Sequence, residues 1–290
     1  MKMSKRILVT GAEGFIGRML VRALRAADYE VLTHSMQDGD IAQNGLEYTD
    51  VSHIYHLAAL TYVPNSWENP HEFYRVNIMG TESVLELCRK VKSSLTFMST
   101  YVYGHPQYTP IDEQHPVAPN TPYNHGKHLA EQLCRFYHDT FKIKVSILRP
   151  FNIYGYGQAS SFLIPEIIGQ ILDPHRYEVE LMSLLPKRDY VYINDVINAL
   201  ISTMKQINDF EIFNIGSGSS FSVLEIATEA MRACGIEKKV ISRGIERPNE
   251  VTDICANISK AAEKLHWVPK YDLFTGLKEM VAQWNQKAKL

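Results

Sequence analysis

The feature that most constrains this chain is a regular alternation of short apolar runs with helical patterns over about its first 150 residues. RILVT at 6–10 precedes the helical pattern GFIGRMLVRALRAAD at 14–28, and the same rhythm returns until VSILRPF at 145–151. Strands that alternate with helices predict β-α-β units and a parallel sheet. We therefore predict an α/β fold with a doubly wound parallel sheet, covered by helices on both faces.

The rhythm breaks after about residue 150, where FNIYGYGQASS is rich in Gly and Tyr. DYVYINDVINALISTM at 189–204 predicts a turn and a helix, and EIFNIGSG at 211–218 predicts a further strand. We expect this later segment to rejoin the first sheet. The predicted first domain is therefore 1–150 plus about 190–215, and the predicted smaller C-terminal α/β lobe is 151–189 plus 216–290.

Composition excludes several classes of partner. The net charge of −2 gives no basic surplus for nucleic acid or acidic membranes. No apolar run approaches the roughly 20 residues of a membrane span, and we expect no signal peptide before the first strand. The four cysteines form no C-x-x-C pair, so we expect reduced thiols, no metal site and a cytoplasmic protein.

Gly11, Gly14 and Gly17 stand directly after the first predicted strand and at the start of the first helix. Such a turn lets the backbone approach a pyrophosphate, and the helix N-terminus adds N–H donors and partial positive charge. Tight helix–strand packing alone is the alternative explanation for three glycines. At this junction of an alternating α/β chain, the spacing favours a dinucleotide site, and hence NAD or NADP.

The sequence leaves the choice between NAD and NADP open. Ser35 ends the second predicted strand where an acidic residue often binds the adenosine ribose, and Asp38 and Asp40 come slightly later. The missing acid permits a 2′-phosphate, so the sequence leans weakly to NADP. Arg18 can reach such a phosphate, although a solvated helix face explains it better.

Tyr123 and Lys127 are four residues apart in TPYNHGKHLAEQ, which places both on one face of a helix. Thr121 can cap that helix, and Pro122 suits its first position. A nearby ammonium lowers the pKa of a phenol, so we expect Tyr123 to be a usable proton donor or acceptor.

Ten motifs together resemble the extended short-chain dehydrogenase/reductase family, and more narrowly its nucleotide-sugar epimerases, dehydratases and ketoreductases. The likeness covers almost the whole chain. The motifs are, in order, TGAEGFIG, GDI, HLAA, VNIMGT, MSTYVYG, YNHGK, RPFNIYGYGQ, KRDYVYINDV, FNIGSG and RPNEVTDICANISKA. The resemblance implies a Rossmann sheet, a nucleoside-diphosphate sugar as substrate, and a homodimer built on the helices at 72–91 and 123–141.

The resemblance also implies roles for single residues. Tyr123 would be the catalytic acid/base, Lys127 its partner, and Ser99, more than Thr100, the hydroxyl at the sugar oxygen; Ser99 and Thr100 could instead merely end a strand. Asn77 is better read as structural. Besides Tyr123 and Lys127, the implied cofactor contacts are Gly11, Gly14, Phe15, Ile16, Gly17, Ser35, Asp40, Ile41, Leu57, Ala58, Ala59 and Pro150.

The implied substrate contacts lie mostly in the second half of the chain. Arg188 and Arg247 would hold the diphosphate, although each also has acidic neighbours in sequence with which it could pair. A Gly-rich run that the family has before its R-D is replaced here by ELMSLLPK. The substrate set is Thr61, Thr100, Asn152, Phe162, Leu163, Arg188 and Arg247.

The 4,6-dehydratases of the family carry acids in the two positions after the Ser or Thr, where this chain has Thr100 and Tyr101. Without those acids we reject a dehydratase. The short stretch between Ser35 and His53 and the segment VPNSWENP resemble the ketoreductases of the family, particularly those that act on 4-keto-6-deoxy sugars, which implies a 4-keto-(6-deoxy)sugar reductase. The alternatives are a 4-epimerase that keeps its NAD, and, more distantly, a regulator that binds NADP without catalysis.

Overall fold

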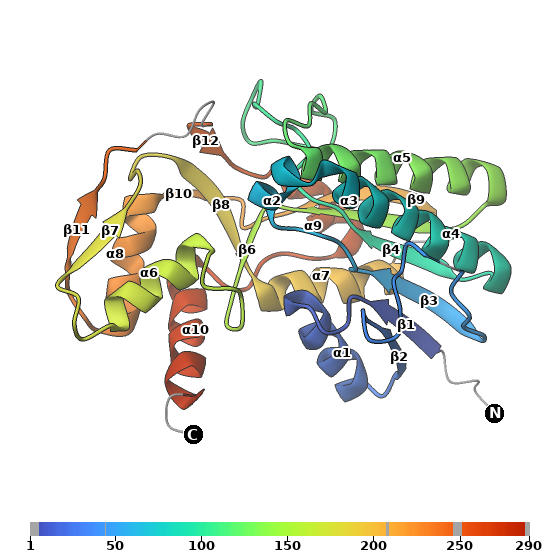
Figure 1. The fold of residues 1–290 in the computed structure, drawn as a ribbon, viewed down its shortest axis with the longest axis horizontal. Coiled ribbons are helices and arrows are strands. Elements are labelled where there is room, and N and C mark those ends of the chain that lie inside the picture. The colour runs from blue at the N-terminus through green and yellow to red at the C-terminus, as the bar shows by residue number, and fades with distance from the viewer. Residues whose placement is uncertain (1–5, 44, 207–208, 246–250, 288–290) are drawn as a thin grey trace.

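The computed structural model describes residues 6–43, 45–206, 209–245 and 251–287, and its centre is a six-stranded parallel sheet (Figure 1). The strand order is β2-β1-β3-β4-β5-β9. The chain leaves β1 for β2 on one side and returns to β3 on the other, so the topological switch point lies between β1 and β3. The strands are β1 (Arg6–Thr10), β2 (Glu30–His34), β3 (Val51–His56), β4 (Ser94–Met98), β5 (Val145–Pro150) and β9 (Phe210–Ile215).

Helices cover both faces of this sheet, which confirms the predicted doubly wound α/β fold. In Figure 1, α1 (Phe15–Ala26) and α7 (Ile193–Gln206) lie below the sheet, while α4 (Gly80–Val91) and α5 (Pro122–Phe141) lie above it. Three short segments lead into α4 on that upper side. They are α2 (Val63–Glu68), α3 (Pro70–Tyr74) and the π-helical turn Arg75–Met79.

The two larger core clusters lie on opposite faces of the sheet, as the alternation of side chains along β1 requires. Ile7 and Val9 pack on the side of Leu20 of α1, whereas Leu8 packs on the opposite side with Leu85 of α4. All five side chains are fully buried. Each contributes about 1.5–3 kcal/mol by burial, which explains why a strand with apolar residues on both faces lies in the middle of the sheet.

Smaller sheets form the other end of the molecule, on the left of Figure 1. β8 pairs with β6, β10 and β12, and β7 pairs with β11. α8 packs between α6 and α10. The strands are β6 (Asn152–Tyr154), β7 (Glu178–Leu181), β8 (Lys187–Tyr192), β10 (Ser220–Ser222), β11 (Lys239–Ser242) and β12 (Asp253–Ile254), and the helices are α6 (Leu163–Leu172), α8 (Val223–Cys234) and α10 (Leu273–Lys287). Between β12 and α10 the chain forms α9 (Ser259–Leu265).

The late strand β9 pairs with β5 in parallel register, from Val145 opposite Phe210 to Pro150 opposite Ile215. The segment expected to rejoin the first sheet therefore does so. α9 also lies against α7 and β9, although the sequence assigned it to the C-terminal lobe. The division into two domains at the stated residues stays a prediction.

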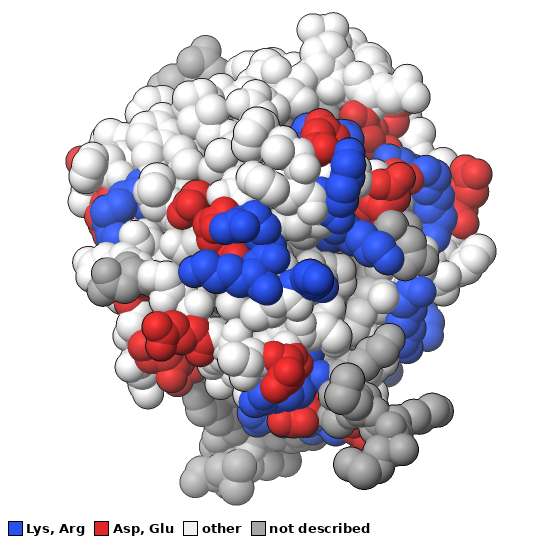
Figure 2. All heavy atoms as spheres, turned by 90° about the vertical axis from the view of Figure 1, so that its right-hand side faces the viewer, with Lys and Arg blue, Asp and Glu red and all other residues white. Residues whose placement is uncertain are grey.

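On the face shown in Figure 2, charged side chains of both signs are mixed, and the described cysteines are free thiols. Figure 2 shows one face on which Lys and Arg side chains lie close to Asp and Glu side chains, so the charges compensate one another locally. Cys88, Cys134 and Cys255 are buried free thiols, and Cys234 is half-buried. Within the described residues, no helix is long and apolar enough to cross a membrane, and no group of three or more His, Cys, Asp or Glu side chains could hold a metal.

Candidate active site

The glycine turn after β1 lies at the switch point of the sheet and leaves room only for backbone. Gly11 has φ +69°, and a Cβ there would lie 2.7 Å from the backbone nitrogen of Ala58. A Cβ on Gly17 would collide with the Gly11 carbonyl oxygen. Gly14 is the N-cap of α1 and offers no side-chain cap, so the first N–H groups of the helix keep their hydrogen-bonding capacity. This cradle fits a diphosphate.

A cavity of about 630 Å³ adjoins the turn. Three arginines of α1 stand on one side of it, and residues after β2 stand on the other. Its lining residues are Ala12, Glu13, Arg18, Val21, Arg22, Arg25, Thr33, Ser35, Gln37 and Asp38. Because a nucleoside attached to the diphosphate must leave the glycine turn at the end of β2, the cavity has the position of an adenosine site.

An acidic group stands at the end of β2 after all. The Asp38 carboxylate turns back and accepts hydrogen bonds from the Ser35 backbone nitrogen at 2.8 Å and from the Ser35 hydroxyl at 3.0 Å. These bonds lower the pKa of Asp38, which keeps it an anion. By its spacing Asp38 comes too late in the sequence, but a turn brings it back to the end of β2, and in this turn the Asp38 N–H also donates to the Ser35 carbonyl oxygen at 3.0 Å.

Arg18 lines the same cavity as Ser35 and is hydrogen-bonded to the glycine turn. Its guanidinium donates to the Glu13 carbonyl oxygen at 2.7 Å, at the rim of the glycine turn. Phe15 and Ile16 are half-buried in the first turn of α1, with Phe15 packed beside Gly155. The bond to Glu13 therefore holds Arg18 at the wall of the cavity.

The segment expected to contact adenine is held in place by its own bonds. Asp40 forms an ion pair with Arg75 at 2.7 Å and accepts a hydrogen bond from the backbone nitrogen of Ala42 at 2.9 Å. The Ile41 side chain is buried beside Gly80 of α4. The side chains of Asp40 and Ile41 therefore serve the fold, and the Asp40 carbonyl oxygen also accepts a hydrogen bond from the Gln43 nitrogen at 3.0 Å.

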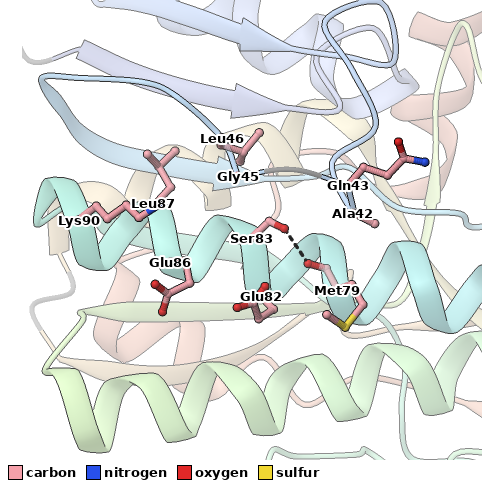
Figure 3. A pocket seen from close by; sticks show the side chains of 10 residues that line it. All are labelled: Ala42, Gln43, Gly45, Leu46, Met79, Glu82, Ser83, Glu86, Leu87 and Lys90. Atoms are coloured by element: carbon pink, nitrogen blue, oxygen red, sulfur yellow. Dashed lines mark hydrogen bonds between the residues drawn. The ribbon is translucent and has the colours of Figure 1, made fainter.

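A second cavity, of about 300 Å³, lies between this connection and α4 (Figure 3). Two of its lining residues are joined by a hydrogen bond, which the Ser83 hydroxyl donates to the Met79 carbonyl oxygen at 3.0 Å. None of the sequence-predicted site residues lines it. Its lining residues are Ala42, Gln43, Gly45, Leu46, Met79, Glu82, Ser83, Glu86, Leu87 and Lys90.

The segment after β3 is tied to the turn after β1. The backbone nitrogen of Leu57 donates to the Thr10 carbonyl oxygen at 3.2 Å, and that of Ala58 donates to the Thr10 hydroxyl at 3.3 Å. The Leu60 backbone nitrogen donates to Asn77 Oδ1 at 2.9 Å, and Asn77 Nδ2 donates to the Leu60 carbonyl oxygen at 3.1 Å. Asn77 thus has the structural role expected of it. Ala59 lies within this clamped segment, and Thr61, just beyond it, is exposed.

Tyr123 and Lys127 begin α5, and the local sequence positions them as expected. The Thr121 hydroxyl caps the helix by accepting from the Asn124 nitrogen at 3.1 Å, and Pro122 occupies the first turn. Tyr123 is 9% exposed and Lys127 is 2% exposed. The pair is therefore removed from bulk water at the carboxyl end of the sheet.

The expected lowering of the phenol pKa by Lys127 is not found in the structure. Burial raises the pKa of Tyr123 above its ordinary value, and a hydrogen bond with Thr100 only partly offsets this. Burial also lowers the pKa of Lys127 to about 8. The Lys127 ammonium lies 4.4 Å from the centre of the Phe97 ring, which is a cation–π contact.

Ser99 follows β4 and is 3% exposed. Its hydroxyl donates to Glu131 Oε1 at 2.5 Å, and Arg149 binds the same carboxylate through two hydrogen bonds. Sequence reasoning missed Glu131 and Arg149. The available signal was spacing, because Glu131 follows Lys127 by four residues and so lies on the same face of α5 as Tyr123.

The residues expected to bind the substrate come from several elements. Asn152 in β6 donates to the Asp189 carbonyl oxygen at 3.1 Å, and Arg188 in β8 donates to the Val251 carbonyl oxygen at 2.6 Å. Phe162 is the N-cap of α6 and is 40% exposed, and Leu163 is the first residue of that helix. Arg247 lies outside the described residues.

Asp189 is a buried structural hub that the sequence suggested only as a partner for Arg188. Its carboxylate accepts from the backbone nitrogens of Ser217, Gly218 and Ala256 at 2.6 to 3.1 Å. Because burial opposes the charge, the pKa of Asp189 is raised in spite of these bonds. Asp189 thereby joins the turn after β9 to β12, close to where Pro150 ends β5.

The glycine cradle, the adenosine-sized cavity at the end of β2 and the buried Tyr-Lys pair on α5 together define a class, the dinucleotide-dependent oxidoreductases with a doubly wound sheet. Comparisons with known proteins refine it. A model of the NAD dependent epimerase/dehydratase family matches residues 7–216. This chain therefore belongs to that family of extended short-chain dehydrogenase/reductases, as its motifs predicted.

Three relatives illustrate the likeness. A protein named "Putative UDP-glucose 4-epimerase" from Methanocaldococcus jannaschii is 32% identical over 301 residues, covering 95% of this chain and 97% of its own. The GDP-6-deoxy-D-talose 4-dehydrogenase of Aggregatibacter actinomycetemcomitans is 33% identical over 232 residues, covering 76% and 77%. The structure of UDP-glucuronic acid 4-epimerase from Bacillus cereus, in complex with UDP-glucuronic acid and NAD, is 27% identical with a TM-score of 0.85, covering 97% and 99%.

Proposed function

We propose that this protein is a 4-ketoreductase, which transfers a hydride to C4 of a nucleoside-diphosphate 4-keto-sugar, in particular a 4-keto-6-deoxy sugar. The observation that carries this choice is the short connection between β2 and β3. It leaves residues 36–39 exposed at the mouth of the adenosine cavity. A reductase must exchange its cofactor in every turnover, and an open adenosine end permits that exchange.

The residues of this chain fit NAD(P) at the glycine turn, where Gly14 leaves the first N–H groups of α1 without a side-chain cap and Gly11 and Gly17 let backbone segments approach closely. NAD(P)H, when bound, supplies the hydride that reduces C4. The backbone of the turn and the N-terminus of α1 would hold the diphosphate. We assign the remaining cofactor contacts to the residues that the motifs implied, including Ser35, Ala58 and Pro150.

Tyr123 would donate the proton that the C4 oxygen needs as the carbon accepts hydride. Its buried position keeps the phenol protonated at neutral pH, as a proton donor requires. Lys127, four residues along the same helix face, would stabilise the phenolate that remains and hold the nicotinamide ribose. Thr100 and Tyr101 provide no carboxylate for elimination of water, so hydride and proton transfer complete the reaction.

We infer that the cofactor is NAD(H) rather than NADP(H). The Asp38 anion at the end of β2 would accept hydrogen bonds from ribose hydroxyls and would repel a 2′-phosphate. Arg18, the residue that could have bound such a phosphate, is engaged with the Glu13 carbonyl oxygen. This inference reverses the weak lean of the sequence to NADP.

The substrate assignment draws on charge and on the relatives. Arg188 and Arg247 would bind the diphosphate, with Asn152, Thr61 and the start of α6 around the nucleoside and sugar. The Aggregatibacter relative is named for oxidation at C4 of a GDP-linked 6-deoxy sugar, which is the reverse of the proposed reduction. Which nucleotide this chain prefers is part of the test below.

A 4-epimerase is the second candidate, because the Methanocaldococcus relative aligns over 95% of this chain and is named for that activity.

We also propose a cytoplasmic homodimer. α4 and α5 pack side by side, and Met79, Phe136 and Phe141 near them are 44–57% exposed, so a second copy would bury apolar surface.

The first experiment is to purify the protein, denature it by heat and assay the supernatant for NAD and NADP. A reductase should retain little cofactor, and its melting temperature should rise with NADH more than with NADPH. UDP- and GDP-linked 4-keto-6-deoxy sugars are then tested for oxidation of added NADH, with Tyr123→Phe as the matched inactive control. Stoichiometric bound NAD, with interconversion of UDP-glucose and UDP-galactose in the absence of added cofactor, would instead establish the epimerase.

A further inference from the structure

One buried carboxylate joins three segments that lie far apart in the sequence. Asp189 of β8 is fully buried. Its Oδ1 accepts hydrogen bonds from the Ser217 backbone nitrogen at 2.6 Å and from the Ser217 hydroxyl at 2.7 Å. Its Oδ2 accepts from the backbone nitrogens of Gly218 at 3.0 Å and Ala256 at 3.1 Å. The carboxylate therefore ties β8 to the turn after β9 and to the chain that follows β12.

An asparagine does not satisfy the donors around this position. Each carboxylate oxygen faces at least one backbone N–H, and a backbone N–H can only donate. Whichever way an amide is turned, its NH2 group would lie against such a donor. The group is also closely packed, because a Cβ on Gly216 would lie 2.6 Å from Asp189 Oδ2. The junction thus requires an acceptor at both oxygens, which a carboxylate provides.

Two of the predicted substrate contacts depend on the segments that Asp189 holds. Arg188 Nη1 donates to the Val251 carbonyl oxygen at 2.6 Å, and β12, which begins two residues later, pairs with β8 in parallel. Asp189 holds the chain beyond the other end of β12 through Ala256. Asn152 Nδ2 donates to the main-chain carbonyl oxygen of Asp189 at 3.1 Å. The Arg188 guanidinium and the Asn152 amide are therefore both attached to this junction.

The Asp189 side chain does not itself lie on the side of Arg188. Neighbouring residues of a strand have their side chains on opposite faces. Asp189 is fully buried between the segments that it joins, whereas Arg188, on the other face of β8, is half-buried. A ligand held by the guanidinium would not touch the Asp189 carboxylate, so the effect of Asp189 on binding passes through the backbone.

Asp195 provides an internal comparison. It is also fully buried, and its carboxylate accepts hydrogen bonds from the backbone nitrogens of Lys270 and Tyr271, both at 3.0 Å. These two bonds hold the segment before α10, which carries none of the predicted substrate contacts. The two aspartates thus share their burial and their type of partner, but they differ in the segments that they hold.

We propose that Asp189 is a positioning residue for substrate binding, which holds Arg188 and Asn152 where they meet a nucleoside-diphosphate sugar. The class of substrate rests on the proposed function. Loss of the carboxylate should weaken the binding of a nucleoside diphosphate and leave the binding of the cofactor unchanged, because the glycine turn after β1 shares none of these bonds.

Isothermal titration tests this with UDP, GDP, dTDP, CDP and ADP on the intact chain saturated with NADH, so that none of them can enter the cofactor site. We expect Asp189→Asn to raise the Kd of the diphosphate that binds about 10- to 100-fold. The Kd of NADH, titrated separately, should stay within about twofold of the wild type. Asp195→Asn is the matched control. It should also lower the melting temperature, but leave both Kd values within about twofold of the wild type.

Ser217→Ala is a milder variant, which removes one of the four hydrogen bonds and keeps the backbone donors. We expect it to raise the Kd of the diphosphate about three- to fivefold, and it decides the question if Asp189→Asn does not fold. An unchanged Kd in the folded variants of Asp189 and Ser217 would overturn the proposal alone, as would an equal rise in Asp195→Asn. A wild type that binds none of the diphosphates would remove the substrate assignment, and the proposal with it.

Discussion

Arg149 and Glu131 form a buried ion pair, with Arg149 Nη2 2.6 Å from Glu131 Oε2 and each side chain 4% exposed. Arg149 also donates to the Tyr103 hydroxyl at 3.0 Å, so the pair joins β5 to α5 and to the loop after β4. Removing one charge would leave the other buried without a partner. The loop that carries Ser99 and Thr100 therefore depends on this pair for its position.

We expect Arg149→Met to lower the free energy of unfolding by about 3–5 kcal/mol at pH 7. Arg243→Met is the matched control, because Arg243 lies at the same 2.6 Å from Glu180 but with side chains 55% and 43% exposed. The control should cost less than about 1 kcal/mol. Urea denaturation measures both, and equal costs would show that burial does not set the strength of the pair.

The same pair predicts a pH dependence. The folded pKa of Glu131 lies below its ordinary value of 4.5, so its contribution to stability is present above about pH 4.5 and is lost as pH falls through the folded pKa. Urea denaturation of the wild type from pH 7 to pH 3 should show this loss. The loss should be smaller in Arg149→Met, in which the favourable charge interaction is already absent.

The buried Lys127 ammonium lowers stability at neutral pH, whereas the Glu131 carboxylate raises it. The reason is that burial lowers the pKa of Lys127 from 10.5 to about 8. The unfolded chain then binds more protons between these two values, so stability should rise with pH in that window and be lowest below it. Lys127→Met removes the buried charge. We expect it to stabilise the cofactor-free protein by about 2–3 kcal/mol at pH 7 and to abolish turnover.

Thermal unfolding from pH 7 to pH 10.5 checks this prediction. The wild type should gain stability relative to Lys127→Met as the pH rises, because only the wild type has a buried ammonium to neutralise. Lys205→Met, at an exposed position on α7, is the control and should follow the wild type at every pH. A destabilised Lys127→Met at pH 7 would mean that the ammonium's contact with the Phe97 ring outweighs its desolvation.

The parts of the site that were predictable from sequence are those fixed by local rules. The glycine turn is such a case, since a side chain on Gly11 or Gly17 would collide with neighbouring backbone atoms. The start of α5 is another, because the N-cap Thr121 and Pro122 in the first turn predict where the helix begins. Tyr123 and Lys127 then lie one turn apart on the same face. The repeated strand–helix rhythm likewise gave the sheet, including the late strand β9.

The parts that were missed depend on contacts between distant segments or on a turn. The direction of Ser99 is decided by Glu131 and Arg149, 32 and 50 positions further along the chain, and no periodicity reports such a triad. Asp38 reaches the end of β2 through a turn that the spacing did not reveal. The rise in the pKa of Tyr123 reflects burial, which a helix-face argument does not include.

Asp38→Asn tests the inferred preference for NAD. The amide keeps the shape of the side chain but removes the anion that repels a 2′-phosphate. We expect the ratio of the Kd for NADPH to the Kd for NADH to fall at least tenfold, mainly because NADPH binds more tightly. Isothermal titration of both cofactors gives the ratio directly.

Asp209→Asn is the control for that experiment, since Asp209 is an exposed acid near His138, away from the cavity. It changes the net charge by the same amount and should leave the ratio unchanged. A wild type that already binds NADPH more tightly than NADH would contradict the inference, and would assign Arg18, Arg22 and Arg25 the role of phosphate ligands instead.

The proposed homodimer makes Phe136 of α5 an interface residue. Its ring is 57% exposed and lies 6.4 Å from that of Phe141, so the two present one apolar surface beside α4. An aspartate at the centre of such a surface would be buried without a partner on association. We expect Phe136→Asp to raise the dissociation constant of the dimer at least 100-fold. The variant protein should then sediment as a monomer at micromolar concentration. Tyr177→Asp is the control, because Tyr177 is 86% exposed just before β7, and it should sediment as the wild type does. Dimers of unchanged affinity in Phe136→Asp would place the interface elsewhere, and a monomeric wild type would refute the dimer itself.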